Sequence, residues 1–316
     1  MIISITWFIC GLVILTIGAE GLVRGSSALA LRLGISPLVI GLTIVAFGTS
    51  APELAVSVEA ATSGSSSISI GNVIGSNIAN IALILGLAAM IEPMRVHTSL
   101  LTMQIPIMIG VSLLLQGMAL DGRISRWDGV ILFAGIIIYN YYSYRSARNA
   151  AVPGLAQPLP GAGPVLMDKT WFCLVLIAAG LAALVGGGSL LVDSAVEIAR
   201  FFEVSESLIG LTIVAIGTSM PELATSVVAS LRKQADIALG NIVGSSIFNI
   251  LGILGIASLI NPLSSTDFSR VDFALMVGIA ILLLPMAWTH RRLGRLEGLF
   301  LFMTYIGYLY YLGPKT

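Results

Sequence analysis

Long apolar segments alternate with short polar ones along the whole chain. Most are about 20 residues long, the length of helix that crosses a hydrocarbon core of about 30 Å. The predicted membrane helices cover residues 2–23, 36–61, 69–91, 100–120, 127–145, 170–192, 206–230, 237–260, 271–289 and 296–312. The pattern therefore predicts an all-α integral membrane protein with ten transmembrane helices.

The second half of the chain repeats the first at a constant offset of 169 residues. GLTIVAFGTSAPELA (41–55) returns as GLTIVAIGTSMPELA (210–224), identical at 13 of 15 positions, and GNVIGSNIANI (71–81) returns as GNIVGSSIFNI (240–250). Each half holds an odd number of predicted helices, so the second half must enter the membrane from the opposite side. We expect two inverted five-helix repeats, 1–145 and 170–316, joined by a cytoplasmic linker at 146–169 that is rich in Pro, Gly and Ala.

Both copies of the GTSxPE motif interrupt an apolar helix with a proline. Pro52 has no backbone donor and its ring clashes with the carbonyl one turn earlier, so the second helix should break near Ala46 to Thr49. Carbonyls released in a membrane must find other partners. Thr49 and Ser50 supply hydroxyl oxygens at the break, and Glu53 adds a carboxylate one turn later. The equivalent residues of the seventh helix are Ala215, Thr218, Ser219, Pro221 and Glu222.

If the two broken helices face each other, their oxygens form a cage with two negative charges. Carboxylate, carbonyl and hydroxyl oxygens without His or Cys suit hard cations such as Ca²⁺ and disfavour zinc and copper. A charge in the bilayer core is costly, so Glu53 and Glu222 require a cation or a proton. Inverted repeats with interrupted helices at matching positions indicate a secondary transporter. The alternative is that each Ser-x-x-Glu is a capping box that restarts its helix.

The third and eighth predicted helices each carry polar residues on one face. A spacing of four residues places these side chains one above another. They are Asn72, Ser76 and Asn80 in the first half and Asn241, Ser245 and Asn249 in the second. For Asn72 and Asn241, a packing seam of small residues with polar side chains as glue is an alternative role. The other four are expected to lie deeper, beside the two glutamates.

Composition agrees with a membrane location and excludes several functions. The chain of 316 residues is 57% hydrophobic and 10% charged with zero net charge, and its mean hydropathy is +0.99. Such a chain has too little polar surface for a soluble globule, and its charge gives no support for nucleic-acid binding. No HExxH, GxSxG or P-loop motif is present, so neither an enzyme nor an ATP-driven pump is expected, and no cofactor.

The Lys and Arg residues predict the orientation. Eleven fall in one set of predicted loops and five in the other. The positive-inside rule places the richer set in the cytoplasm and both termini outside. We expect a multi-pass protein of the cell membrane with lipid as its surroundings and a monomer as the functional unit.

At these motifs the sequence resembles the cation/calcium exchanger superfamily, and specifically its sodium/calcium exchanger branch. The two alpha-repeats of that family are carried by GTSAPE with GNVIGSNIAN and by GTSMPE with GNIVGSSIFN. The resemblance covers both halves and implies Ca²⁺ ligands at Thr49, Glu53, Thr218 and Glu222. It implies flanking Na⁺ sites made by the carbonyls of Ala46 and Ala215 with Ser50, Ser76, Ser219 and Ser245, and a middle lined by Asn80 and Asn249.

The sequence therefore predicts a Na⁺/Ca²⁺ antiporter that works by alternating access. Many microbial relatives carry Asp where this chain has Asn249, and Asn at both central positions is closer to the potassium-independent exchangers. Three alternatives remain open: an H⁺-coupled or K⁺-dependent cation antiporter on the same fold, a passive cation channel, and a membrane sensor that binds Ca²⁺ without transport.

Overall fold

The computed structural model describes residues 2–149, 169–202, 215–266 and 268–312. Its first half comprises α1 (Ile2–Leu33), α2 (Pro37–Ile40), η1 (Gly41–Val45), α3 (Ala46–Thr49), α4 (Ala51–Thr62), α5 (Ser66–Ile78), η2 (Ala79–Leu85), α6 (Gly86–Ile91), β1 (Met94–Arg95), η3 (Leu100–Gln104), α7 (Ile105–Met118), η4 (Ala119–Asp121), β2 (Arg123–Ile124) and α8 (Arg126–Asn149). The second comprises α9 (Thr170–Phe201), α11 (Ala215–Thr218), α12 (Met220–Leu231), α13 (Ala235–Phe248), η7 (Asn249–Leu254), α14 (Gly255–Ile260), β3 (Leu263–Ser264), α15 (Arg270–Trp288), η8 (Thr289–Arg291), β4 (Arg292–Leu293) and α16 (Arg295–Leu312).

The elements of the two halves recur at the offset found in the sequence. Adding 169 to the bounds of α3, α4, α6, β1 and β2 gives those of α11, α12, α14, β3 and β4. The packing is reciprocal too, because α8 of the first half contacts α14 and η7, while α16 of the second half contacts α6 and η2. Each half therefore packs against the other in an equivalent way.

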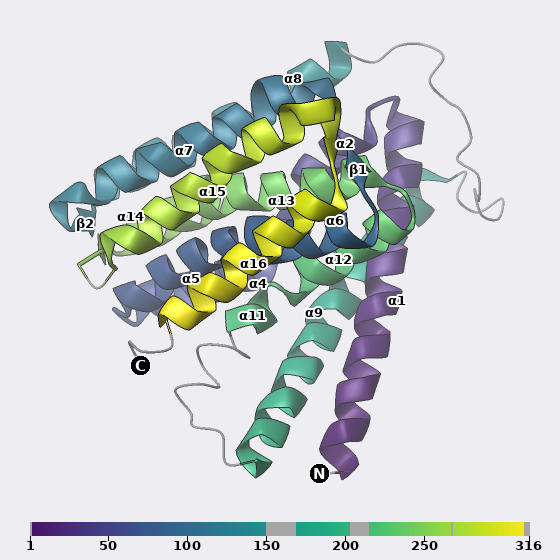
Figure 1. The fold of residues 1–316 in the computed structure, drawn as a ribbon, viewed down its shortest axis with the longest axis horizontal. Helices are drawn as coiled ribbons and strands as arrows, with labels where there is room; N and C mark the ends of the chain where they lie inside the picture. The colour runs from purple at the N-terminus through teal and green to yellow at the C-terminus, as the bar shows by residue number, and fades with distance from the viewer. Residues whose placement is uncertain (1, 150–168, 203–214, 267, 313–316) are drawn as a thin grey trace.

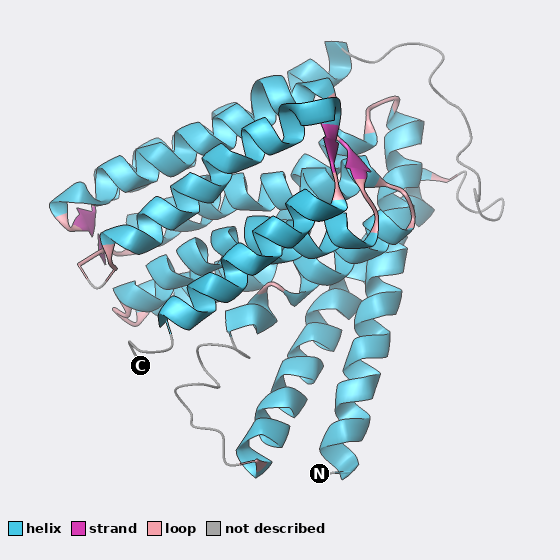
Figure 2. Ribbon diagram, viewed as in Figure 1, coloured by secondary structure: helices cyan, strands magenta, loops and turns pink. Residues whose placement is uncertain are grey.

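Four two-residue strands form two small antiparallel pairs, which an all-α prediction did not include. In one pair, Met94 lies opposite Leu293 and Arg95 opposite Arg292; in the other, Ile124 lies opposite Leu263 and Arg123 opposite Ser264. The two pairs are equivalent under the 169-residue offset and are the magenta segments of Figure 2. Each pair clips a loop of one half to a loop of the other.

The protein is an all-helical membrane protein. In the part of the chain that the structure describes, six helices are long and apolar enough to cross a membrane: Ile3–Leu33, Ser66–Ile91, Leu100–Asp121, Thr170–Phe201, Ala235–Ile260 and Arg270–Arg291. The bent pair Pro37–Thr49 and Ala51–Thr62 brings the number to seven. The described residues do not include the first residues of the expected span 206–230 or most of the expected linker, 150–168. Helix α8 continues to Asn149, into the segment expected to be the linker.

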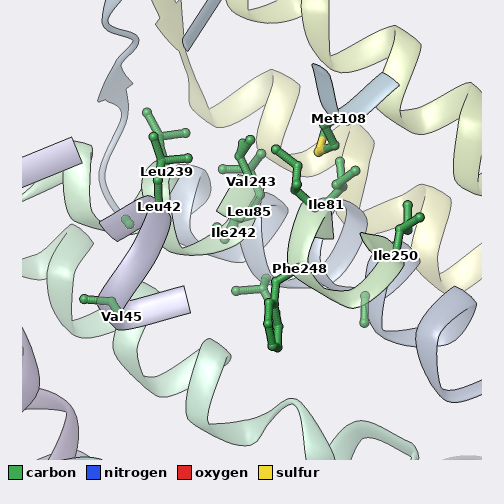
Figure 3. Close-up of a cluster of buried hydrophobic side chains, with 14 of the residues drawn as sticks. Leu42, Val45, Ile81, Leu85, Met108, Leu239, Ile242, Val243, Phe248 and Ile250 are labelled. Carbon is green, nitrogen blue, oxygen red and sulfur yellow. The ribbon is translucent and has the colours of Figure 1, made fainter. Parts of the chain in front are cut away.

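The core is built around the two helices that carry the GNxxGSxxxN motifs. Residues of α5, η2, α13 and η7 are mostly buried, and the hydrophobic cluster around them includes Ile81, Leu85, Val243 and Ile250 (Figure 3). A helix surrounded by other helices can place polar side chains away from lipid. These two helices are therefore the ones able to hold a polar site inside the membrane.

Helices α1 and α9 form an antiparallel pair at one flank of the molecule (Figure 1). Glycines allow their backbones to approach closely. A Cβ atom added at Gly187 would lie 2.8 Å from the backbone nitrogen of Leu15, and one added at Gly18 would lie 2.9 Å from that of Leu184. Small residues at such a crossing allow van der Waals packing between membrane helices, which is the main source of their association.

We predict that Gly187→Val separates α1 from α9 and destabilises the protein. Overpacking of a tight contact costs about 1–3 kcal/mol, so the temperature of thermal unfolding in detergent should fall by several degrees. Gly186→Val is the matched control, because a Cβ atom at Gly186 meets nothing within 4 Å. Equal unfolding temperatures for the two variants would show that the close crossing contributes nothing to stability.

Candidate cation site

Both GTSxPE segments break their helix at the serine. Helix α3 ends at Thr49 and α4 begins at Ala51, with an angle of 47° between the segments on either side. Ser50 has φ −83° and ψ 10°, and Ser219 has φ −88° and ψ 10° at the equivalent point between α11 and α12. The break lies one residue beyond the expected Ala46 to Thr49. Proline is tolerated there because it falls in the first turn of the new helix, where backbone donors have no partner in any case.

The two serines at the breaks each donate a hydrogen bond to the glutamate of the opposite repeat. The Ser50 hydroxyl donates to Oε1 of Glu222 at 2.8 Å, and the Ser219 hydroxyl donates to Oε1 of Glu53 at 3.0 Å. Neither serine caps its own helix with its side chain. The capping-box interpretation is therefore wrong for both segments: each hydroxyl serves the other half of the molecule.

Each glutamate keeps a second carboxylate oxygen without a hydrogen-bond donor. Oε2 of Glu53 and Oε2 of Glu222 are buried and have no partner in the described structure, and the same holds for Oδ1 of Asn80 and Oδ1 of Asn249. All four side chains are 1% exposed. Buried polar atoms are almost always paired, so a group of unpaired oxygens in a native interior calls for an explanation.

The carbonyl of Ala46 is satisfied by protein groups rather than left free. It accepts hydrogen bonds from the backbone N–H of Ser50 at 3.1 Å and from the hydroxyls of Thr49 at 3.3 Å and Ser245 at 3.4 Å. Ser245 comes from α13 of the other half, and its bond brings that helix to the break. The Thr49 hydroxyl has one proton, which it shares between this carbonyl and Oδ1 of Asn241 at 3.0 Å, and both hydroxyl oxygens keep their lone pairs.

Most of the predicted site residues are connected by these contacts. The Ser219 hydroxyl also lies 3.3 Å from that of Ser76, so one connected group contains Glu53, Ser76 and Ser219. A second group contains Ala46, Thr49, Ser50, Glu222 and Ser245. Ala215 and Thr218 begin and end α11, at the second break. Asn249 is held by a different residue, because its amide donates to Oδ1 of Asn77 at 3.3 Å. No hydrogen bond joins the Asn80 side chain to either group in the described structure.

Two asparagines support the breaks from neighbouring helices, which agrees with the polar packing role predicted from the sequence as an alternative for Asn72 and Asn241. Asn72 donates to the carbonyl of Glu53 at 3.0 Å and to the Ser57 hydroxyl at 2.9 Å. Asn241 donates to the Ser226 hydroxyl at 3.1 Å and accepts from the Thr49 hydroxyl at 3.0 Å. Ser57 and Ser226 are equivalent at the 169-residue offset. The sequence signal for these contacts is therefore the repeat itself, because the Asn–Ser pair occurs at equivalent positions in both halves.

The chemistry of the site is that of oxygen ligands with two acidic groups. The described residues contain no cluster of three or more His, Cys, Asp or Glu side chains. The available ligands are two carboxylates, several hydroxyls and amide or backbone carbonyl oxygens. This set fits hard cations such as Ca²⁺ and Na⁺ and does not fit metals that prefer nitrogen or sulfur.

The fold and this site define a membrane protein with a buried, acidic oxygen site between two structural repeats. A family model described as "Sodium/calcium exchanger protein" matches residues 3–145 and 172–313. The chain belongs to this family, the sodium/calcium exchanger branch of the cation/calcium exchanger superfamily.

Individual relatives cover almost the whole chain. A protein named putative antiporter CaxA, from Alkalimonas amylolytica, is 39% identical and covers 99% of both chains. The sodium/calcium exchanger MaX1 of Methanosarcina acetivorans is 34% identical with 95% of both chains covered. A solved structure of the sodium-calcium exchanger NCX_Mj aligns with a TM-score of 0.85, 34% identity and 98% of both chains covered. Family and fold support a cation/Ca²⁺ antiporter and not an enzyme.

We predict that Asn72→Ala destabilises the protein, because it removes two hydrogen bonds at the first helix break. Leaving buried partners unsatisfied costs about 1–3 kcal/mol, which thermal unfolding in detergent measures. Asn140→Ala is the control, since the Asn140 amide bonds only the Ile136 carbonyl of its own helix at 2.9 Å in the described structure. If both variants unfold at the same temperature, Asn72 does not support the break.

Proposed function

We propose that the protein exchanges Na⁺ for Ca²⁺ across the membrane by alternating access. The observation that carries the proposal is the reciprocal pair of Ser–Glu bonds. Each buried carboxylate is held on one oxygen by the opposite repeat and keeps the other oxygen unpaired. These two unpaired oxygens, together with the hydroxyls at the helix breaks, are the proposed cation ligands. MaX1 and NCX_Mj, which are named as sodium/calcium exchangers, support the choice of ions.

The proposed ligands follow the repeat. Ca²⁺ is bound by Thr49, Glu53, Thr218 and Glu222. Na⁺ is bound at flanking positions by the carbonyls of Ala46 and Ala215 together with Ser50, Ser76, Ser219 and Ser245. Asn80 and Asn249 line the middle of the site, where their buried carbonyl oxygens supply uncharged ligands.

Charge balance explains why the two ions take turns. Two carboxylates are neutralised by one Ca²⁺ or by two Na⁺, and both loads together would leave a large uncompensated charge in the membrane interior. A third Na⁺ on the hydroxyl and carbonyl ligands makes the Na⁺-loaded state net positive, so exchange is electrogenic. An inward Na⁺ gradient then drives Ca²⁺ out of the cell.

The proposed topology has ten membrane helices in two inverted five-helix repeats, with both termini outside the cell membrane. It is supported by the 169-residue recurrence of helix and strand bounds and by the reciprocal packing of α8 and α16. The halves are residues 1–145 and 170–316, with a cytoplasmic linker at 146–169. A relative from Escherichia coli, 36% identical, is named inner membrane protein YrbG. Ca²⁺, Na⁺ and lipid are the proposed partners, and the monomer is the functional unit.

We predict that ⁴⁵Ca²⁺ uptake into proteoliposomes requires Na⁺ inside the vesicles. Glu53→Gln and Glu222→Gln should each abolish this uptake, because one carboxylate cannot neutralise Ca²⁺. Glu59→Gln is the matched control: Glu59 lies in the same helix as Glu53 but is exposed, so its variant should transport normally.

The same experiment separates the proposal from its alternatives. Vesicles loaded with K⁺ or choline should show no uptake. Uptake that follows a pH gradient without Na⁺ would establish H⁺ coupling, and uptake that needs no ion inside would establish a channel. Ca²⁺ binding without uptake would indicate a sensor. Survival of uptake in both Glu→Gln variants would overturn the site assignment.

We further predict that the exchange carries charge. If three Na⁺ leave the vesicle for each Ca²⁺ that enters, one net positive charge moves outward per cycle. An inside-positive potential favours this movement and should therefore raise the initial rate of Ca²⁺ uptake. Moving one charge across 100 mV corresponds to about 2.3 kcal/mol. The potential is imposed with valinomycin and a K⁺ gradient. A rate that does not respond to either sign of potential would indicate electroneutral exchange of two Na⁺ for one Ca²⁺.

A further inference from the structure

The clip between β1 and β4 gathers basic side chains at one end of the molecule. We call Arg95, His97, His290, Arg291 and Arg292 the basic clip; all five are exposed. Arg95 and Arg292 lie directly opposite each other in the antiparallel pair. Their neighbours Met94 and Leu293 point inward and are buried, so both arginines point outward on the same side.

The equivalent clip between β2 and β3 lacks this concentration of charge. Arg291 is replaced there by Gly122, Arg95 by Ser264, and His290 by the acidic Asp121. Only Arg123 is shared, as the equivalent of Arg292. The backbone contact is nevertheless the same: the carbonyl of Arg291 accepts from Val96 N–H at 2.9 Å, and that of Gly122 accepts from Ser265 N–H at 2.9 Å. The turn itself therefore does not require the basic residues.

Two features of the basic clip are unfavourable for the protein alone. Like charges directly opposite each other on a strand pair repel, and this is the arrangement of Arg95 and Arg292. His290 and Arg291 also have left-handed backbone conformations, with φ of 61° and 50°. Gly122 takes φ 84° at the position equivalent to Arg291, and glycine does so without steric cost. Strained positions of this kind tend to occur where function demands them.

No acidic side chain in the described structure forms a salt bridge with these arginines. The guanidinium of Arg291 instead reaches the Thr98 hydroxyl at 3.4 Å. Of the nearby acids, Asp236 interacts with His97, and Glu297 accepts the backbone N–H of Gly294 at 3.1 Å. In the described structure the three arginines therefore have no acidic partner and are exposed.

The surroundings of the clip are those of a membrane interface. Trp288 is 60% exposed and Leu296 is 79% exposed, and both lie within four residues of Arg292 in the chain. Exposed tryptophan beside arginine is typical of the headgroup level of a bilayer. Lipid phosphates lie at this level of a bilayer.

We propose that the basic clip binds the headgroup of an anionic phospholipid. The phosphate accepts hydrogen bonds from Arg95, Arg291 and Arg292, which removes the repulsion across the strand pair and offsets the strain at Arg291. The positive-inside rule alone requires positive charge in a loop, but not an arginine opposite an arginine or at a glycine position. This proposal goes beyond ion exchange and does not depend on it.

The test uses the full-length purified protein and dioleoylphosphatidylglycerol, with phosphatidylcholine as the neutral lipid. Arg95→Ser and Arg291→Gly each introduce the residue of the opposite clip, and Arg123→Ser is the matched control on β2. Native mass spectrometry in detergent measures lipid binding. We expect the affinity for phosphatidylglycerol to fall about fivefold for each arginine removed from the basic clip and to stay unchanged in Arg123→Ser.

Thermal unfolding in nanodiscs supplies a second readout. In phosphatidylcholine alone, Arg291→Gly should unfold at the same temperature as the wild type or higher, because the strain is relieved. Phosphatidylglycerol should raise the unfolding temperature of the wild type more than that of Arg291→Gly. Three results would overturn the proposal: equal lipid affinity in the wild type and the Arg95→Ser/Arg291→Gly double variant, an equal loss in Arg123→Ser, or the same stabilisation by inorganic phosphate.

Discussion

Two carboxylates buried in a membrane protein repel each other and are no longer solvated by water, which makes their ionised forms costly. The arrangement of the rest of the molecule follows from this constraint. Glu53 and Glu222 are each tied to the serine of the other repeat. Those bonds satisfy one oxygen of each carboxylate and leave the other without a hydrogen-bond donor. The protein therefore ties each acidic group to the opposite repeat but does not neutralise it, and a charge buried in the membrane interior requires a cation or a proton.

The helix breaks serve this same requirement. A continuous helix would use its backbone carbonyls internally, with none released at the site. Proline stops the hydrogen-bond ladder at Ser50 and Ser219, and Asn72 and Asn241 support the break from the neighbouring helices. The most buried helices of the molecule supply those asparagines. Polar groups are thus surrounded by protein rather than lipid, where each unsatisfied group would cost several kcal/mol.

The sequence predicted the recurrence, the broken helices and most of the residues that hydrogen-bond around the breaks, because each has a local pattern. These patterns are an apolar run of membrane length, a proline within it, and a motif that returns at one offset. It could not predict which atoms meet across the repeats. The choice between a capping box and a bond to the opposite Glu222 depends on the packing of α3 against α12, and the local pattern Ser-x-x-Glu is the same in both cases. The strand clips were missed because two residues are too few to show a period, and their partners lie in the other half of the chain. The position of Asn249 against Asn77 likewise depends on long-range packing.

The clips have a consequence for the synthesis of the chain. Met94 pairs with Leu293, 199 positions later (293 − 94), and α6 packs against α16, which is made after all the other described elements. At about 5–20 residues per second, strand β1 has been made for roughly 10–40 s before its partner leaves the ribosome. During this time the first half carries an unpaired strand edge and an uncovered helix face. Its native contacts cannot form in order along the chain, so final assembly waits for the last helix, and a chain truncated before β4 would be a substrate for membrane quality control rather than a partly active protein.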